Sequence, residues 1–205
     1  MSPTAKFEKT KTEMKKLLFG LIALIAIGSL SSCGYNTAVK LDEKVKASWG
    51  EVENQYQRRA DLIPNLVNTV KGAANFEKET LTQVIEARAK ATSVQVDPDK
   101  LTPENIQKFQ SAQGQVSQAL GRLMVVSERY PELKANANFQ ELQAQLEGTE
   151  NRIAVARRDF NQSVQEYNTQ IRTFPNNIFA GMFGFQQKGS FTAEAGADKT
   201  PKVEF

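Results

Sequence analysis

The chain of 205 residues contains no histidine and a single cysteine, Cys33. Without histidine it cannot form a Ser-His-Asp or Cys-His triad, and with one thiol it cannot form an intrachain disulfide or a zinc site of histidine and cysteine ligands. Apolar residues make up 40% of the chain and charged residues 24%, which is typical of a globular body and not of a polytopic membrane protein or a disordered tail. These absences exclude many of the familiar catalytic and metal sites.

The excess of basic residues is confined to the start of the chain. The formal net charge is +3, but residues 1–33 hold five lysines and two glutamates, and the rest of the chain holds 21 residues of each sign. A neutral body gives no reason to expect an anionic partner. Nucleic-acid binding requires a basic stripe that neutralises phosphates, so we expect no nucleic-acid partner.

Residues 14–32 have the arrangement of a bacterial signal peptide. A basic head at residues 14–16 precedes a charge-free apolar run over residues 17–29, which is too short to span a bilayer comfortably. The following segment, Leu30-Ser31-Ser32-Cys33-Gly34, resembles a lipobox, whose cysteine is alkylated with diacylglycerol and becomes the new N-terminus. This resemblance implies lipidation of Cys33. Two or three fatty acyl chains of the palmitate type anchor far more firmly than a single myristoyl chain.

Several alternatives accompany the predicted leader. Residues 1–13 have no signal-peptide features, and we interpret them as an over-extended gene start before Met14. The alternative to lipidation is an uncleaved signal anchor in which Cys33 is incidental. Gly34 stands where enteric bacteria use aspartate to retain lipoproteins in the inner membrane. That rule predicts an anchor in the outer membrane facing the periplasm, with the inner membrane as the alternative.

The first segment after Cys33 predicts one amphipathic helix. Its apolar residues recur three or four positions apart: Leu41, Val45, Trp49, Val52 and Tyr56. We expect this helix to begin near Tyr35 and to end at Lys71 and Gly72. Pro64 removes the backbone bond to the Ala60 carbonyl, which predicts a kink or, alternatively, a break capped by Asp61.

Three more helices follow from the spacing of apolar residues and from capping signals. The second opens near Asn75 and ends in the turn around Asp97, Pro98 and Asp99. The third starts with Thr102 as N-cap and ends at Pro131. The fourth starts at a capping box of Asn138 and Glu141 and extends to about Phe174. We therefore predict an all-α fold over residues 33–180, an antiparallel bundle of three to four long helices.

The order and spacing of many residues resemble the LemA family. The matching positions are 35–36, 49, 58–67, 70–72, 87–88, 128–135, 139, 145–153, 156–158, 167–168, 174–175 and 183–185. The resemblance implies a bacterial envelope protein with an N-terminal hydrophobic segment, a helical-bundle body and no established enzymatic activity. We expect a non-catalytic, lipid-anchored cell-envelope scaffold that binds an unidentified envelope protein.

The residues Arg58, Arg59 and Asp61 form the first candidate site. Two guanidiniums beside a proline that frees backbone groups could bind an anion or a partner, and the alternative function is a ligand-binding or weakly enzymatic protein that uses them. The structural interpretation, which we favour, is that they pair with acids of the long helix such as Glu147 or Glu150. By the same reasoning, Trp49 and Tyr56 are interpreted as core residues.

The C-terminal end forms the second candidate site, because it is rich in aromatic and aliphatic residues. They are Phe174, Ile178, Phe179, Met182, Phe183, Phe185 and Phe191. Such density is typical of a membrane-surface or partner contact, for which Phe179, Phe183 and Phe185 are the candidates. The alternative, which we favour, is that these three fold back and cap the bundle. Within the aromatic C-terminal segment and tail at residues 181–205, we expect residues 193–205 to be flexible.

Glutamates and arginines of the last long helix do not predict a metal or catalytic centre. Ferritin-like sites need a Glu-x-x-His ligand pair, and glycosidases need two carboxylates that face across a cleft, which a closed bundle lacks. We therefore expect no metal, no cofactor and no catalytic residue. A homo-oligomer is compatible with the glutamine- and alanine-rich faces, and the sequence leaves that question open.

Overall fold

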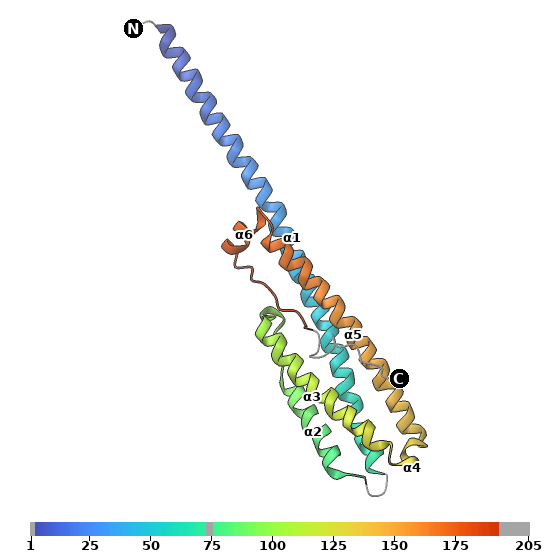
Figure 1. The fold of residues 1–205 in the computed structure, drawn as a ribbon. Coiled ribbons are helices and arrows are strands. Elements are labelled where there is room, and N and C mark those ends of the chain that lie inside the picture. Colours follow the sequence, from blue (N-terminus) through green and yellow to red (C-terminus); the bar gives the residue numbers. More distant parts are fainter. Residues whose placement is uncertain (1–2, 73–75, 193–205) are drawn as a thin grey trace, which may run out of the picture.

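The computed structural model describes the backbone of residues 3–72 and 76–192. Within these ranges, side chains are described from residue 34 onward and for Met14, Lys16 and Leu18. All regular structure in this part of the chain is helical, which confirms the all-α prediction (Figure 1). The predicted flexible tail at residues 193–205 and the side chain of Cys33 lie outside the described residues.

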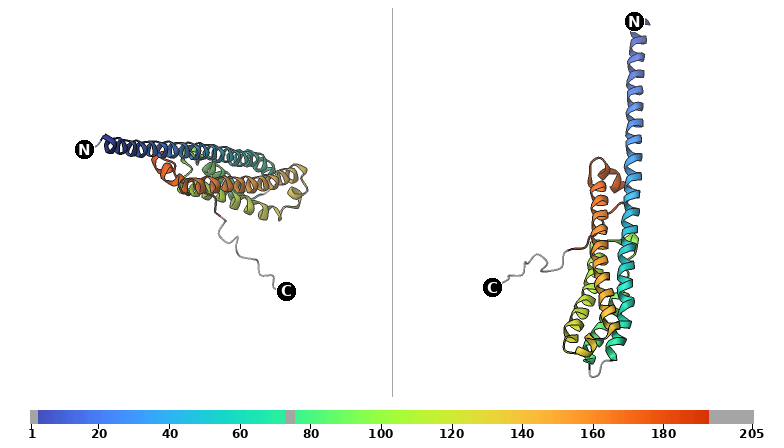
Figure 2. Two further views of the ribbon diagram at one scale, coloured as in Figure 1. Left: turned by 90° about the horizontal axis from the view of Figure 1, so that it is seen from above. Right: turned by 90° about the vertical axis from the view of Figure 1, so that its right-hand side faces the viewer.

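Long helices dominate the molecule. In chain order the elements are α1 (Pro3–Lys71), α2 (Lys78–Ser93), the 3-10 helix η1 (Pro98–Lys100), α3 (Pro103–Ser127), α4 (Pro131–Lys134), α5 (Ala137–Arg172) and α6 (Asn176–Met182). Consecutive long helices run in opposite directions, and the N-terminal part of α1 extends well beyond the others (Figures 1 and 2). Helix α1 packs along α5, α2 packs on α3, and α1 also contacts α2. Among the described residues, no helix has an apolar stretch long enough to cross a membrane.

Local sequence signals set several helix ends as predicted. Helix α1 ends at Lys71. Thr102 caps α3 by accepting a hydrogen bond from the backbone N–H of Asn105, and Pro103 occupies the first helical position. The Asp97 carboxylate accepts from the backbone N–H of Asp99 at 2.9 Å, so the predicted turn is a short 3-10 helix.

Other predicted boundaries are wrong. Helix α5 is capped by Asn136, whose side chain accepts from the backbone N–H groups of Asn138 and Phe139; Asn136 has the extended backbone that an N-cap needs, and Asn138 is already helical. Helix α1 begins at Pro3 instead of near Tyr35. Three further ends differ by a few residues: α2 begins at Lys78, α3 ends at Ser127 and α5 ends at Arg172.

Two clusters of buried apolar residues form the core of the molecule. One surrounds Trp49 and Tyr56, both buried as predicted, and joins α1 to α5, α3 and the C-terminal segment. The other lies between α1, α2, α3 and the first half of α5. Two large apolar residues, Ile85 and Phe174, are exposed. Ile85 lies beside the buried Val84 on α2, and Phe174 lies beyond the last turn of α5 and so leaves the helical phase.

An extended segment, residues 186–192, follows α6 and runs back along the bundle. Three amide side chains bind its backbone through both an N–H and a carbonyl, at distances of 2.8 to 3.2 Å. The pairs are Asn168 with Lys188, Asn161 with Phe191, and Gln110 with Thr192. These bonds place the Phe191 ring in the core, 5.5 Å from the Phe160 ring and 6.1 Å from the Trp49 ring.

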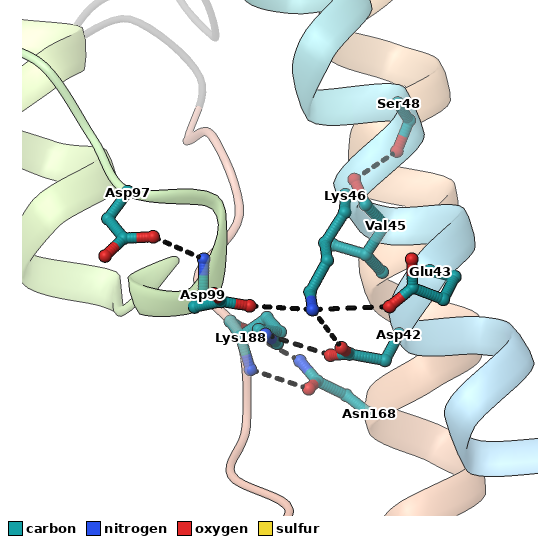
Figure 3. Close-up of polar contacts among 9 residues, drawn as sticks. All are labelled: Asp42, Glu43, Val45, Lys46, Ser48, Asp97, Asp99, Asn168 and Lys188. Carbon is teal, nitrogen blue, oxygen red and sulfur yellow. Dashed lines mark hydrogen bonds and ion pairs between the residues drawn. The ribbon is translucent and has the colours of Figure 1, made fainter.

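A cluster of charged side chains joins this segment and η1 to α1 (Figure 3). The Lys46 ammonium lies 2.7 Å from the Asp99 carboxylate and 3.2 Å from that of Asp42. Lys188 lies 2.9 Å from the same Asp42. The hydrogen bond to Asp99 is the main reason that the pKa of Lys46 is raised, and the same bond lowers the pKa of Asp99.

Candidate functional site

A groove of about 560 Å³ lies between α1, α2 and α3. Its α1 wall carries residues from Glu53 to Ile63, and the end of α2 and the connection at residues 94–98 form the second wall. Phe109, Gln113 and Val116 of α3 line the remaining side. The groove therefore contains one of the predicted site residues, Arg59, and several residues that the sequence analysis did not select.

Arg59 lies at the inner side of this groove and is only 2% exposed. Its Nη1 donates to Glu150 at 2.6 Å and to the Ser117 hydroxyl at 2.9 Å, and its Nη2 donates to the side chain of Gln113 at 2.7 Å. The guanidinium carbon also lies 5.0 Å from the centre of the Tyr56 ring. Arg59 thus links α1 to α3 and α5, including the interpreted pairing with Glu150.

Arg58 and Asp61 do not join Arg59 in one site. Both side chains are exposed on α1, and neither lines the groove. The Asp61 carboxylate accepts a hydrogen bond from Gln57 one turn earlier, at 2.8 Å. Because consecutive helical positions point about 100° apart, neighbouring arginines in the sequence face different surroundings. The structure does not bring the three predicted residues together.

Arg88 of α2 crosses to α1 at the groove. Its Nε donates to the Ala60 carbonyl at 2.7 Å. Pro64 has no N–H, so Ala60 has no helical partner and this bond replaces the missing one. Helix α1 consequently continues through Pro64, and the predicted alternative of a break is wrong. The only sequence signal for this role was the position of Arg88 in the LemA-like pattern.

Glu53 lies on the α1 wall and is half-buried. Burial raises the pKa of its carboxyl, and the nearby indole N–H of Trp49 lowers it to a smaller extent. The Trp49 Nε1 atom is itself buried and makes no hydrogen bond with any described residue. It therefore lowers the pKa of Glu53 by lying close to the carboxyl and not through a formed hydrogen bond. Burial also raises the pKa of Tyr56. The α1 wall of the groove therefore contains a carboxyl group whose ionisation is disfavoured by burial.

The groove offers a carboxyl group and a guanidinium at two points along α1. Glu53 and the Ala60 carbonyl held by Arg88 lie two helical turns apart on α1, or about 10 Å. Both groups can form hydrogen bonds with polar groups of an extended chain that lies along α1. No group of three or more potential metal-ligating side chains occurs among the described residues.

The aromatic candidates lie at the opposite end of the cluster around Trp49, on and after α6. Phe179 and Phe185 are half-buried, and Phe185 packs against that core cluster. Phe183 remains more than half exposed, although its ring lies 5.0 Å from that of Tyr35. The predicted folding back onto the bundle therefore fits Phe179 and Phe185 better than Phe183.

Comparison with known proteins identifies the family. The model of the LemA family matches residues 48–205, most of the chain and all the residues of the groove. The chain belongs to the LemA family. This confirms the resemblance inferred from the residues. The matched region covers α2, α3, α5 and α6 completely and α1 from Ser48.

Individual relatives are distant but cover most of the chain. The magnetosome protein MamQ 2 of Paramagnetospirillum magneticum is 26% identical over 204 residues, which cover 91% of this chain and 75% of that protein. MamQ of Magnetospirillum gryphiswaldense is 26% identical over 207 residues, 91% of this chain and 76% of that protein. Protein LemA of Metamycoplasma hominis is 27% identical over 177 residues, which cover 82% of this chain and 75% of that protein. These relatives cover 82–91% of this chain, and the family model covers residues 48–205.

Proposed function

We propose that this LemA-family protein is a non-catalytic, membrane-anchored protein of the cell envelope that holds a segment of a partner protein in the groove between α1, α2 and α3. Its four long helices, α1, α2, α3 and α5, act as one antiparallel bundle. One observation carries the proposal: the lipobox-like cysteine and the groove residues Glu53 to Ile63 lie on one uninterrupted helix. A scaffold needs such a rigid connection between its anchor and its binding surface.

The anchor part of the proposal rests on the sequence around Cys33. A basic head, an apolar run and a lipobox-like segment precede the only thiol of the chain. Lipidation there would attach α1 to the membrane through two or three acyl chains. The proposed location is the outer membrane with the body in the periplasm, and the alternative is the inner membrane.

The binding part rests on the chemistry of the groove. Its lining combines apolar residues such as Ile63 and Val116 with a half-buried carboxyl at Glu53 and the Arg88 guanidinium. Apolar contact area with a few oriented polar groups is typical of a recognition site. The second candidate, a small ligand or a weak reaction near Arg58, Arg59 and Asp61, would have to use the groove side of this region, because Arg59 is already bonded to Glu150 and Gln113.

Metabolic labelling with a fatty acid tests the anchor. The wild-type protein should carry the label and fractionate with membranes, and Cys33→Ala should lose both the label and the membrane association. Unlabelled wild-type protein that stays in the membrane would overturn lipidation and support an uncleaved signal anchor.

Site-specific photo-crosslinking in cells tests the groove. A photoreactive amino acid at the exposed Thr92, on the groove wall, should capture a discrete envelope protein, and the same probe at Val155 on the outer face of α5 should not. Adding Glu53→Lys should abolish the capture at Thr92 without changing the melting temperature by more than a few degrees. Equal capture at both positions, or capture that survives Glu53→Lys, would overturn partner binding in the groove.

A further inference from the structure

Helix α6 carries apolar side chains on both of its faces. Ala180 is buried and Phe179 half-buried toward the bundle. Ile178 and Met182, four residues apart, form an exposed outer stripe of α6, and Met182 is 75% exposed. Phe174, which precedes α6, is 76% exposed. Large apolar side chains that gather on one exposed surface mark a contact with a partner or a membrane. The outer stripe of α6 therefore lacks a cover within the described part of the chain.

The place of α6 in the molecule indicates what covers it. Helix α6 lies against α1 where α1 leaves the bundle (Figure 1). The contact is close: a Cβ atom at Gly34 would collide with the Asn176 side chain, and the ring of Tyr35 lies 5.0 Å from that of Phe183. The position proposed for lipidation, Cys33, immediately precedes Gly34 on the same helix.

The height of the membrane surface follows from this geometry. The apolar run at residues 17–29 ends five residues before Gly34, or about 8 Å along a helix. Acyl chains on Cys33 would enter the bilayer even closer to α6. With either the lipid anchor or the alternative signal anchor, the membrane surface would lie at the level of α6.

The charge distribution at this end suits a membrane surface. The sequence contains no aspartate or glutamate in residues 14–41 or in residues 167–192. The cations Lys40 and Arg172, which lie within these two ranges, are exposed. Anionic lipid headgroups attract cations and repel carboxylates. The next acidic residues of α1 beyond residues 14–41 are Asp42 and Glu43, which pair with Lys46.

We propose that the outer stripe of α6, formed by Ile178 and Met182, inserts together with the flanking Phe174 and Phe183 into the headgroup and acyl boundary of the membrane that anchors the protein. This inference rests on the anchoring part of the proposed function but not on the type of anchor. An apolar helix face of this kind lies in the interface plane, several ångströms deep. Two contacts, the anchor and α6, would then fix the orientation of the long helices relative to the membrane. The groove would begin at Glu53, about 27 Å of helix beyond Tyr35.

Quenching by brominated lipids tests the contact. The full chain is reconstituted in vesicles of phosphatidylethanolamine and phosphatidylglycerol, with or without bromine on the acyl chains. Phe183→Trp places a fluorophore on the proposed contact, and Val125→Trp is the matched control, because Val125 is 71% exposed at the end of α3 that is far from α6. The native Trp49 is fully buried and supplies a constant background.

The fluorescence added by Phe183→Trp should fall by about half in brominated vesicles, and that added by Val125→Trp should not change. Met182→Trp supplies a second measurement if Phe183→Trp does not fold. Variants that do not co-sediment with vesicles would overturn the anchor and the contact together. Co-sedimentation without quenching at positions 182 and 183 would overturn the α6 contact alone. Protection of these positions in native membranes without quenching in pure lipid would identify a protein as the cover instead and would likewise overturn the proposal.

Discussion

Arg88 of α2 donates a hydrogen bond from its Nε to the carbonyl of Ala60 in α1, at 2.7 Å. In an uninterrupted helix this carbonyl would accept from the N–H of residue 64, which is a proline here. A side chain from a neighbouring helix therefore satisfies the backbone group that the proline leaves free. The same bond brings Arg88 to the edge of the groove.

This relationship predicts a specific coupling between positions 64 and 88. Arg88→Ala should lower the free energy of unfolding by about 1–3 kcal/mol, because the Ala60 carbonyl loses its partner. In the Pro64→Ala background, a backbone N–H becomes available at position 64, and Arg88→Ala should cost distinctly less. Urea unfolding of the four proteins measures the coupling. An equal cost in both backgrounds would show that Arg88 does not compensate for Pro64.

The two neighbouring arginines of α1 should differ sharply in their contribution to stability. Arg59→Ala should cost about 1–3 kcal/mol, because its loss leaves the buried Gln113 side chain without its partner and removes the bonds to Ser117 and the partly exposed Glu150. Arg58→Ala should change stability by no more than about 0.5 kcal/mol, since Arg58 is exposed. Urea midpoints of the two variants provide the comparison, and similar losses at both positions would contradict the assigned roles.

Two glycines should respond in opposite directions to the same substitution. A Cβ at Gly189 would lie 2.5 Å from the Pro103 Cα, so Gly189→Ala should displace residues 186–192 and destabilise the protein. A Cβ at Gly121, within α3, would meet no atom within 4 Å. Gly121→Ala should therefore stabilise the protein by about 0.5–1 kcal/mol through its higher helix propensity. Hydrogen exchange at Phe191 reports whether the segment is released, and unchanged protection in Gly189→Ala would contradict the close packing.

The Glu53 carboxyl should make the stability of the groove region depend on pH. Burial raises its pKa above the ordinary value of 4.5, so the folded chain binds this proton more tightly than the unfolded chain does. The stabilising effect is present below the ordinary pKa and is lost as the pH rises through the raised pKa. Relative to Glu53→Gln, the wild-type protein should lose stability between about pH 4 and about pH 7.

Urea midpoints at the two pH values measure this difference. Glu51→Gln, on the exposed side of the same helix, is the control for a general effect of removing one carboxylate from α1. A difference between wild type and Glu53→Gln that stays constant with pH, or that equals the difference for Glu51→Gln, would contradict the effect of burial.

Helix type and core composition could be predicted from local pattern. The spacing of apolar residues identified the buried seams of α3 and α5, and Thr102 with Pro103 marked the start of α3, because periodicity and capping act within a few residues. The start of α5 was misplaced by two residues because Asn136 and Asn138 are chemically equivalent caps. Only the backbone conformation distinguishes them.

The candidate site was harder to predict, because it depends on which way each side chain points. Arg58, Arg59 and Asp61 are close in sequence, yet α1 turns Arg59 into the core and the other two toward solvent. Glu53 of α1 and Arg88 of α2 line the same groove although they lie on different helices.

The sequence alone determined the helices, the neutral body and the absence of histidine chemistry, since these follow from composition and short-range spacing. It also carried the LemA resemblance. The tertiary structure decided that Arg88 donates a hydrogen bond to the Ala60 carbonyl that Pro64 leaves without a partner. It also decided that Phe191 packs in the core and that α6 keeps an apolar outer face. This face lies close to Gly34, at the start of the bundle. Each of these depends on contacts between segments far apart in the chain. Such contacts depend on how the helices pack and are not encoded in the pattern of any single helix.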